Sequence, residues 1–295
     1  MQSRGIRCTG IEPTASTAAA ARAKGIETIE EFFGAGLALR LAADGQQADL
    51  IVANNVLAHV PDINDFVRGF ETLLEPNGIA TFEFPHLSRL IAENQFDTIY
   101  HEHFSYLSLT ATQRILSANG LAIFDVEELS THGGSLRVYA QRSVTGTREV
   151  TTSVDAILAR EAEEGVQSST YYAGFQAKAE KVRRDFVQFL VECKHQGKRV
   201  SAYGAAAKGN TLMNFAGCGA DLIAYVVDRN PAKQGKFMPG SRVPIVDEQM
   251  LMEDKPDYIV ILPWNLKAEV MQQLDYVREW GCRFVTAIPG LEIVS

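Results

Sequence analysis

The first half of the chain alternates between short apolar runs and longer helix-like stretches. The apolar runs predict strands at residues 8–12, 49–54 and 79–84, and helices are expected between them at residues 15–24 and 66–74. The run at 49–54 is apolar through its middle, which is typical of a strand buried on both faces. Strands and helices that alternate in this way indicate a mostly parallel sheet covered by helices.

The pattern changes after a helix predicted at residues 111–119. Two strands at 121–129 and 135–142 are joined by the turn-rich segment Ser130-Thr-His-Gly-Gly134, which predicts an antiparallel pair. Residues from about 150 to 196 then carry apolar positions at helical spacing among many charges, and Gly197 ends this stretch. We interpret it as a helical connector.

A second alternating unit begins near residue 199. Its predicted strands cover residues 199–203, 222–227, 258–262 and 283–288, with helices expected around 210–215 and 266–280. The predicted fold class is therefore α/β, with two tandem, open, mostly parallel sheets joined by a helical connector. The expected domains are residues 1–147, 148–196 and 197–295.

The first predicted strand ends in an acid, Glu12, and only residues 1–7 precede it. In doubly wound nucleotide-binding folds such an acid usually ends the second strand, and a glycine-rich loop comes before it. Either Glu12 has a different role here, or the first sheet lacks its beginning.

Composition narrows the function classes. The net charge of −8 lacks the basic footprint of a nucleic-acid binder, and 46% hydrophobic residues exclude wholesale disorder. The four cysteines lie far apart, which excludes CxxC-type zinc and redox motifs. No apolar run has the length of a membrane span or of a signal-peptide core, so no membrane partner and a cytoplasmic location are expected.

The segment Tyr100-His101-Glu102-His103-Phe104 concentrates acid–base side chains. It could supply a general base, an acid and an orienting group within one loop. A metal site is a second interpretation, although in a strand His101 and His103 would face away from Glu102. A solvated polar loop is the plain alternative.

Further polar residues follow the predicted strands. Asn54, Asn55 and His59 come after the strand at 49–54, where ligands bind in parallel sheets, although the two asparagines could simply satisfy loop backbone groups. His132 stands beside two glycines that keep its approach open. His86 and His195 are expected on the surface.

The segment Tyr203-Gly204-Ala-Ala-Ala-Lys208-Gly209-Asn210 lies between a predicted strand and a helix. Small residues let a ligand approach the backbone, the helix N-terminus offers N–H groups to a phosphate, and Lys208 adds a positive charge. Asp228 ends the next strand, where a ribose-binding acid would fall. A tight structural turn with a chance lysine is the alternative.

These motifs occur together in one order that resembles a known family. The ordered set is Gly10-Ile-Glu-Pro-Thr14, Asn54-Asn-Val-Leu-Ala-His-Val-Pro61, Phe82-Glu-Phe-Pro85, Tyr100-His-Glu-His-Phe104, His132-Gly-Gly134, the lysine loop of residues 203–210 and Val227-Asp-Arg-Asn-Pro-Ala-Lys233. It resembles the S-adenosylmethionine-dependent sugar C-methyltransferases, which act on nucleotide-linked keto-deoxysugars. The resemblance covers essentially the whole chain.

The resemblance implies a role for each candidate residue. The first, Rossmann-like sheet would hold S-adenosylmethionine through Glu12, Asn54 and Asn55. His103 would remove the proton next to a ketone, with Tyr100, Glu102 and His59 orienting it or stabilising the enolate. A nucleotide-diphosphate sugar would be bound by the remaining candidates, which are Tyr203, Gly204, Lys208, Asn210, Asp228 and His132.

The sequence departs from the family at its front. Family members carry an N-terminal cysteine-containing zinc domain and a first strand with a glycine-rich cofactor loop, and neither pattern occurs here, so we expect an N-terminally truncated member. A non-catalytic nucleotide-sugar-binding protein is therefore the alternative function. A metal-dependent enzyme built on His101, Glu102 and His103 is a third.

Overall fold

The computed structural model describes residues 4–294, which form two compact units. Unit 1 comprises the chain up to His86 together with Phe104–Leu129 and Ser135–Glu163. Unit 2 comprises Leu87–His103, Ser130–Gly134 and the chain from Glu164 onward. The predicted boundaries at residues 147 and 196 did not foresee the two short segments that belong to unit 2.

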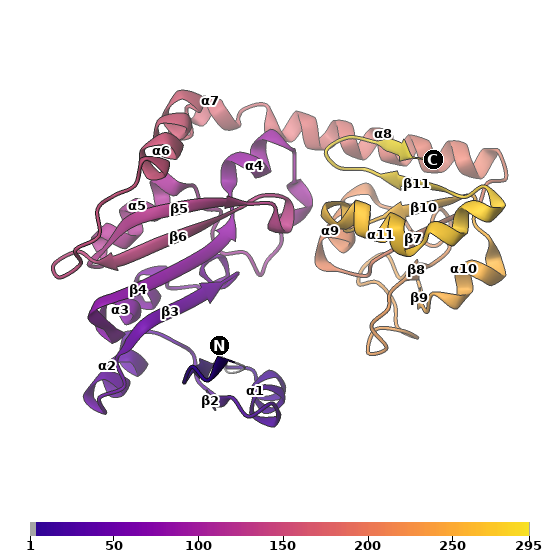
Figure 1. Ribbon diagram of the computed structural model, residues 1–295. Coiled ribbons are helices and arrows are strands. Elements are labelled where there is room, and N and C mark those ends of the chain that lie inside the picture. The colour runs from indigo at the N-terminus through magenta and orange to yellow at the C-terminus, as the bar shows by residue number, and fades with distance from the viewer. Residues whose placement is uncertain (1–3, 295) are drawn as a thin grey trace. The chain divides into compact units, whose positions relative to one another are not determined.

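Unit 1 contains two separate sheets (Figure 1). Strands β1 (Thr9–Ile11) and β2 (Glu27–Ile29) form a parallel pair, where a single first sheet was expected. A second sheet has the order β3-β4-β6-β5, with β3 and β4 parallel and the other pairings antiparallel. Its strands are β3 (Ala48–Asn54), β4 (Leu74–Pro85), β5 (Leu121–Leu129) and β6 (Ser135–Arg142). The predicted antiparallel pair is confirmed with its bounds unchanged.

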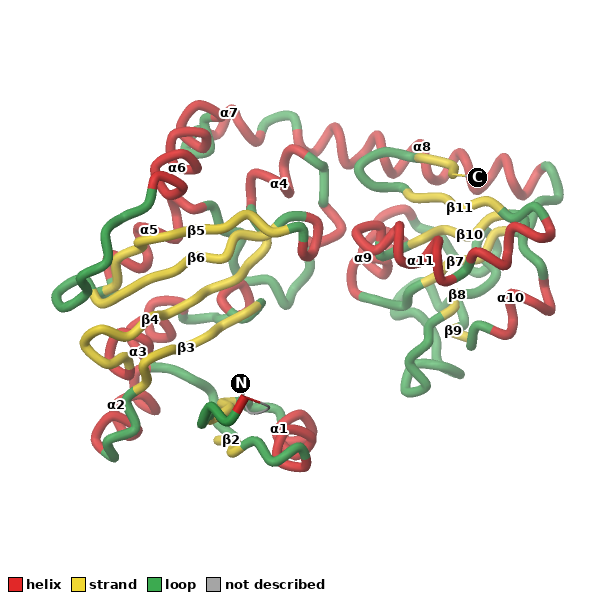
Figure 2. The backbone as a smooth tube through the Cα atoms, viewed as in Figure 1, coloured by secondary structure: helices red, strands yellow, loops and turns green. Residues whose placement is uncertain are grey.

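The helices of unit 1 alternate with these strands along the chain (Figure 2). They are α1 (Ala15–Ala23), α2 (Ala35–Ala43), the short η2 (Leu57–His59), α3 (Ile63–Leu73), α5 (Leu109–Ala118) and α6 (Thr152–Glu164). Aromatic side chains anchor α3 to β4, because the ring centroids of Phe70 and Phe82 lie 4.6 Å apart. Asp62 accepts a hydrogen bond from the Asp65 amide and so caps the start of α3.

The prediction that residues 49–54 are buried on both faces is wrong. Leu50 and Val52 are each 45% exposed, whereas Ala53 is buried and Ile51 packs against buried side chains. Strand β3 is the edge of its sheet, with β4 as its one neighbour in the described chain. An apolar run thus marks the strand but not the number of its covered faces.

His86, expected on the surface, is buried beside an acid, and this prediction is also wrong. Its Nε2 atom lies 2.8 Å from Oε1 of Glu161, and the two residues are 2% and 1% exposed. Glu161 also accepts the backbone N–H groups of Leu109 and Thr110, at 2.6 and 2.8 Å, and the Thr110 hydroxyl. The carboxylate therefore holds the first turn of α5. His195 is exposed, as predicted.

Unit 2 is built on a six-stranded sheet of order β12-β11-β10-β7-β8-β9. All pairings are parallel except that of β12. The strands are β7 (Val200–Tyr203), β8 (Val226–Val227), β9 (Ile245–Val246), β10 (Tyr258–Ile261), β11 (Arg283–Thr286) and β12 (Glu292–Val294). The alternating second half of the chain is confirmed as a mostly parallel sheet.

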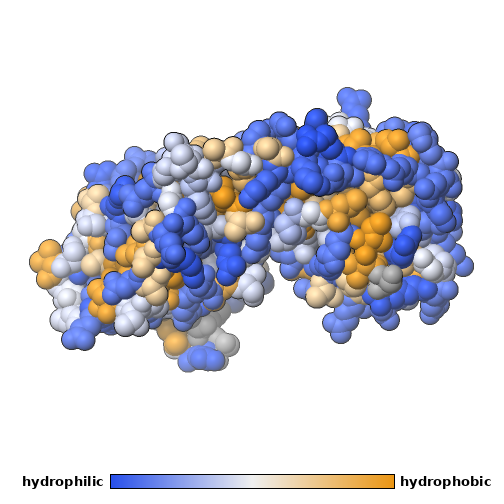
Figure 3. Space-filling model, turned by 90° about the horizontal axis from the view of Figure 1, so that it is seen from above, coloured by the Kyte–Doolittle hydropathy of each residue, from blue (hydrophilic) through white to orange (hydrophobic). Residues whose placement is uncertain are grey.

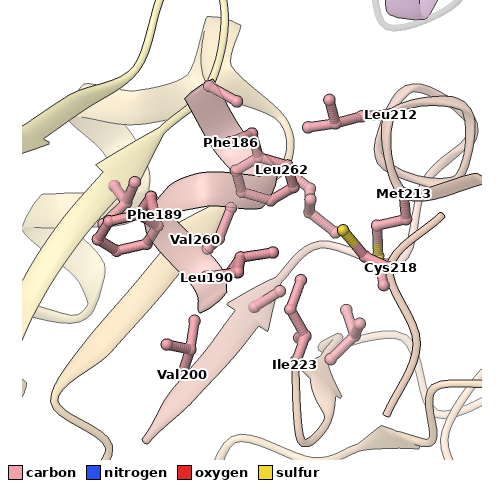
Figure 4. Close-up of a cluster of buried hydrophobic side chains, with 14 of the residues drawn as sticks. Phe186, Phe189, Leu190, Val200, Leu212, Met213, Cys218, Ile223, Val260 and Leu262 are labelled. Atoms are coloured by element: carbon pink, nitrogen blue, oxygen red, sulfur yellow. The ribbon is translucent and has the colours of Figure 1, made fainter. Parts of the chain in front are cut away.

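Helices cover both faces of this sheet. The helices of unit 2 are α4 (Leu87–Ala92), η3 (Phe96–Thr98), η4 (Thr131–Gly133), α7 (Ser169–Tyr172), α8 (Phe175–His195), α9 (Ala207–Ala216), α10 (Gln249–Asp254), η5 (Trp264–Leu266), α11 (Lys267–Gln273) and η6 (Asp275–Trp280). Figure 4 shows Phe186 and Leu190 of α8 facing Val200 and Val260 of the sheet, with Met213 of α9 in the same cluster. A second core lies on the other face, where α10, α11 and η6 supply Leu251, Val270 and Val277.

The face of the molecule drawn in Figure 3 is mostly hydrophilic, with separate apolar clusters. Among residues 4–294, no helix combines the length and apolarity needed to cross a membrane.

The order of the strands places a switch point between β7 and β10. After β7 the chain continues to β8 on one side, and later returns to β10 on the other side of β7. The loops that leave β7 and β10 are in close contact, because a Cβ atom on Gly204 would lie 2.5 Å from the Pro263 ring. The carboxyl ends of parallel strands at such a switch point are where ligands bind in open α/β sheets.

Candidate active site

His103 is held in one defined orientation. Its Nδ1 atom lies 2.8 Å from the carbonyl oxygen of Thr98, and its backbone N–H donates to the Tyr100 carbonyl at 3.0 Å. A carbonyl oxygen only accepts, so Nδ1 carries the proton. In the neutral ring the basic lone pair is then on Nε2.

The neighbours of His103 lie in a loop, between η3 and α5, rather than in a strand. The Tyr100 ring packs against His103, with centroids 4.2 Å apart. His101 and Glu102 are exposed, and His103 is half-buried. Among residues 4–294, no cluster of three or more histidine, cysteine, aspartate or glutamate residues could hold a metal ion.

The turn that holds His103 also carries a buried acid that the sequence did not single out. Asp97, in η3, is 0% exposed and accepts a hydrogen bond from Nε1 of Trp264 at 2.8 Å. Burial raises the pKa of Asp97 to about 6, against the opposing effects of Trp264 and of the positive charge on Lys208. Asp97, Trp264 and Thr98 thus join the candidate site.

Lys208 lies at the switch point, in the first turn of α9. Its Nζ donates to the His132 carbonyl and to Oδ1 of Asn265, each at 3.1 Å, and lies 4.6 Å from the centre of the Trp264 ring. Burial lowers the pKa of Lys208, and the negative charge on Asp97 partly opposes this. An ammonium group has three N–H donors, so the two hydrogen bonds leave one N–H for a ligand.

Close approach of other side chains explains the glycines around Lys208. Gly204 has φ +94° and lies against Pro263, and Gly133 has φ +91° with the Trp264 ring 2.3 Å from the position of a Cβ atom. His132, between β5 and β6, also has a left-handed backbone, with φ 57°. Only glycine meets both the conformation and the space at residues 133 and 204.

Three further substrate-side candidates lie around the same loop. The Tyr203 side chain is in the core, and its hydroxyl accepts from Gln273 at 2.6 Å. Asp228 accepts from the amides of Ala205 and Asn230, at 2.9 Å each, and pairs with Lys233 at 3.1 Å. Tyr203 and Asp228 therefore fix the shape of the loop.

Asn210 is the third of these candidates. It lies in the first half of α9, and its side-chain oxygen is buried without a hydrogen-bond partner within the protein. Buried amide oxygens normally have a partner, so this atom suits a donor from a ligand or from water.

The cofactor-side candidates belong to unit 1. Glu12 follows β1 directly, and its Oε1 accepts the Thr14 amide at 2.8 Å, which orients the carboxylate at the end of the strand. Asn54 ends β3, and Asn55 has a left-handed backbone, with φ 56°, whose N–H donates to the Glu83 carbonyl. His59 ends η2 and is half-buried.

Two family models match the chain, one in each half. A family described as the C-methyltransferase C-terminal domain matches residues 130–289, and one described as a methyltransferase domain matches residues 1–126. The C-methyltransferase NovU of Streptomyces niveus is 35% identical over 291 residues, which are 99% of this chain and 69% of that protein.

The solved structures that match the chain are more distant. A 1,6-didemethyltoxoflavin-N1-methyltransferase from Burkholderia thailandensis is 15% identical, with a TM-score of 0.35, over 48% of this chain and 64% of its own. A possible histamine N-methyltransferase from Thermotoga maritima is 15% identical, with a TM-score of 0.38, over 47% of this chain and 74% of its own. On the family matches and the NovU relative, the chain belongs to the S-adenosylmethionine-dependent C-methyltransferase family.

Proposed function

We propose that this methyltransferase alkylates a carbon atom of a nucleotide-linked keto-deoxysugar. In the proposed reaction, Nε2 of His103 removes the proton from the carbon next to the ketone and leaves an enolate. The enolate carbon then forms a bond to the methyl group while the bond between that methyl group and sulfur breaks. S-adenosylmethionine supplies the electrophilic methyl group.

The hydrogen bond from His103 to Thr98 carries this proposal. A general base needs its lone pair on the atom that faces the substrate, and the Thr98 carbonyl fixes the tautomer that leaves Nε2 free of its proton. The enolate oxygen needs donors aimed at its developing charge. We assign that role to Tyr100 and His59, and an orienting role to Glu102.

On the substrate side, we assign the diphosphate to Lys208 and to the N-terminal amides of α9. The remaining N–H of Lys208 and the amides of the first helical turn suit an anion at the switch point. Asn210 and Gly204 would contact the same ligand. Tyr203, Asp228 and His132 would shape the loops around it.

On the cofactor side, the chemistry of the donor set supports Glu12. A carboxylate at the end of a strand accepts the two hydroxyl groups of a ribose, and the Thr14 amide holds Glu12 in place for this. Asn54 and Asn55 offer amide groups at the end of β3 for the polar part of the same molecule.

Replacement of one of two neighbouring histidines tests the proposed base. His103→Asn should lower methyl transfer by about 10²–10⁴-fold, because proton removal loses its base. His101→Asn, at the exposed neighbouring position, should keep nearly full activity. The assay is transfer of labelled methyl groups to a nucleotide-linked keto-deoxysugar, with the affinity for that sugar measured in parallel.

Two results would contradict the proposal. Full activity of His103→Asn would remove His103 as the base. A wild-type protein that binds the nucleotide sugar and the methyl donor but transfers no methyl group would favour the alternative of a nucleotide-sugar-binding protein.

A further inference from the structure

The Asp97 carboxylate is fully buried although only one of its two oxygens has a hydrogen-bond partner within the protein. Its Oδ2 atom accepts the Trp264 N–H, but its Oδ1 atom is buried and has no hydrogen-bond partner within the protein. Burying a carboxylate with an unpartnered oxygen is costly, and native proteins rarely keep such a group where an apolar residue could stand. A functional reason for Asp97 is therefore expected.

The Trp264 ring connects Asp97 to Lys208. The edge of the indole donates to Asp97, and the face of the same ring lies under the Lys208 ammonium group, 4.6 Å from its centre. A carboxylate that accepts the indole N–H increases the electron density of the ring, which strengthens its attraction for a cation. The carboxylate thus acts on Lys208 both through the ring and by its own charge.

The rest of the cluster leaves Lys208 little freedom. Its Nζ is hydrogen-bonded to the His132 carbonyl and to Asn265, and Gly133 of the same turn lies against the Trp264 ring. The Gln95 side chain, two residues before Asp97, donates to the Gly133 carbonyl at 2.7 Å. The turn η4, to which Lys208 is hydrogen-bonded, is therefore itself held by the segment that carries Asp97.

We propose that Asp97 is a positioning residue that holds the Lys208 ammonium group in place for a diphosphate, acting through Trp264. This inference rests on the proposed function, because it takes Lys208 as the diphosphate ligand. Asp97 is followed directly by Thr98, whose carbonyl orients His103. One turn, η3, thereby sets the position of both the proposed base and the proposed anion ligand.

Calorimetric titration with uridine and thymidine 5′-diphosphates tests the assignment, with the matching nucleosides as uncharged ligands. Lys208→Met should weaken diphosphate binding strongly. Asp97→Asn, which keeps an oxygen for the Trp264 N–H but removes the charge, should weaken it about tenfold and leave nucleoside binding unchanged. Trp264→Phe, which keeps an aromatic ring but removes the N–H donor, should also weaken diphosphate binding.

The double variant Asp97→Asn/Lys208→Met separates positioning from a general structural effect. If Asp97 acts on Lys208, the double variant should bind the diphosphate no more weakly than Lys208→Met alone. Asp257→Asn is the matched control, because Asp257 pairs with Lys198 and the Arg199 amide at the opposite end of β7. It should leave diphosphate affinity unchanged.

Each other outcome overturns a defined part of the account. Unchanged diphosphate affinity in Lys208→Met, or no diphosphate binding by the wild-type chain, would overturn the proposed diphosphate site and the role of Asp97 with it. If Lys208→Met binds the diphosphate more weakly but Asp97→Asn binds it as tightly as wild type, or more tightly, only the role of Asp97 is overturned. Additive losses in the double variant, or equal losses for nucleoside and diphosphate, would show a structural effect alone.

Discussion

At the scale of single residues, Glu161 is a buried carboxylate whose two oxygens accept hydrogen bonds from His86, Leu109 and Thr110. Burial alone would raise its pKa, but His86, the Thr110 hydroxyl and amide, and the Leu109 amide lower it from the ordinary 4.5 to about 2. A carboxyl with a depressed pKa in the folded state stabilises the fold above its unfolded pKa. That stabilisation is lost as the pH falls from 4.5 toward 2.

Glu161→Gln should therefore lower the free energy of unfolding by about 2–4 kcal/mol at pH 7, because it removes the charge that these donors hold. The difference from wild type should stay constant down to about pH 5 and shrink below pH 4.5. Urea unfolding at a series of pH values measures it. Glu128→Gln, in a partly exposed pair with Arg160, should cost less than about 1 kcal/mol. Equal losses for both variants would contradict this.

The residues that the sequence pointed to are those whose type suggests chemistry, such as His103 and Lys208. Their partners were not predictable in the same way. Asp97 and Trp264 are 167 residues apart, and neither stands in a recognisable motif, so the contact arises only in the folded chain. Thr98 acts through a backbone carbonyl that every residue type has, and no sequence signal could have identified it.

At the scale of elements, the alternation of strand and helix patterns and the turn residues predicted the strands better than single apolar runs did. The antiparallel pair β5 and β6 was predicted with its bounds unchanged, because its turn residues are distinctive. The strand expected at 222–227 is reduced to Val226–Val227, since the Leu222 and Ile223 amides donate to the Gly219 carbonyl in a turn. Short elements such as β2 and β9 were missed because two or three residues hold no periodicity.

Two glycines, one on each side of β7, offer a matched comparison. Gly204→Ala should lower the free energy of unfolding by about 2–5 kcal/mol, because a left-handed residue would also collide with Pro263. Gly197→Ala has a similar left-handed backbone but nothing within 4 Å of its Cβ position, so it should cost only about 1–2 kcal/mol. Urea unfolding compares the two variants. Equal costs would mean that the Pro263 contact is not tight.

At the scale of the whole molecule, the alternating pattern predicted two α/β sheets in tandem. The mostly parallel sheet of unit 2 is confirmed, whereas unit 1 carries two sheets instead of one. The assignment of residues 87–103 and 130–134 to unit 2 was not predictable, since both segments lie within the sequence of unit 1. It is these segments that carry the proposed base and the turn that Lys208 holds. In our proposal the base therefore belongs to unit 2, and the residues assigned to the cofactor belong to unit 1.

The central claim is that His103 removes the proton next to the ketone. Exchange of solvent deuterium into the substrate tests this claim most directly. A nucleotide-linked keto-deoxysugar is incubated with the protein in D₂O without any methyl donor, and deuterium at the carbon next to the ketone is followed by NMR. We expect wild type and His101→Asn to exchange this position well above the uncatalysed rate, and His103→Asn to return it to that rate. Exchange at the uncatalysed rate in the wild type, or undiminished exchange in His103→Asn, would contradict the account.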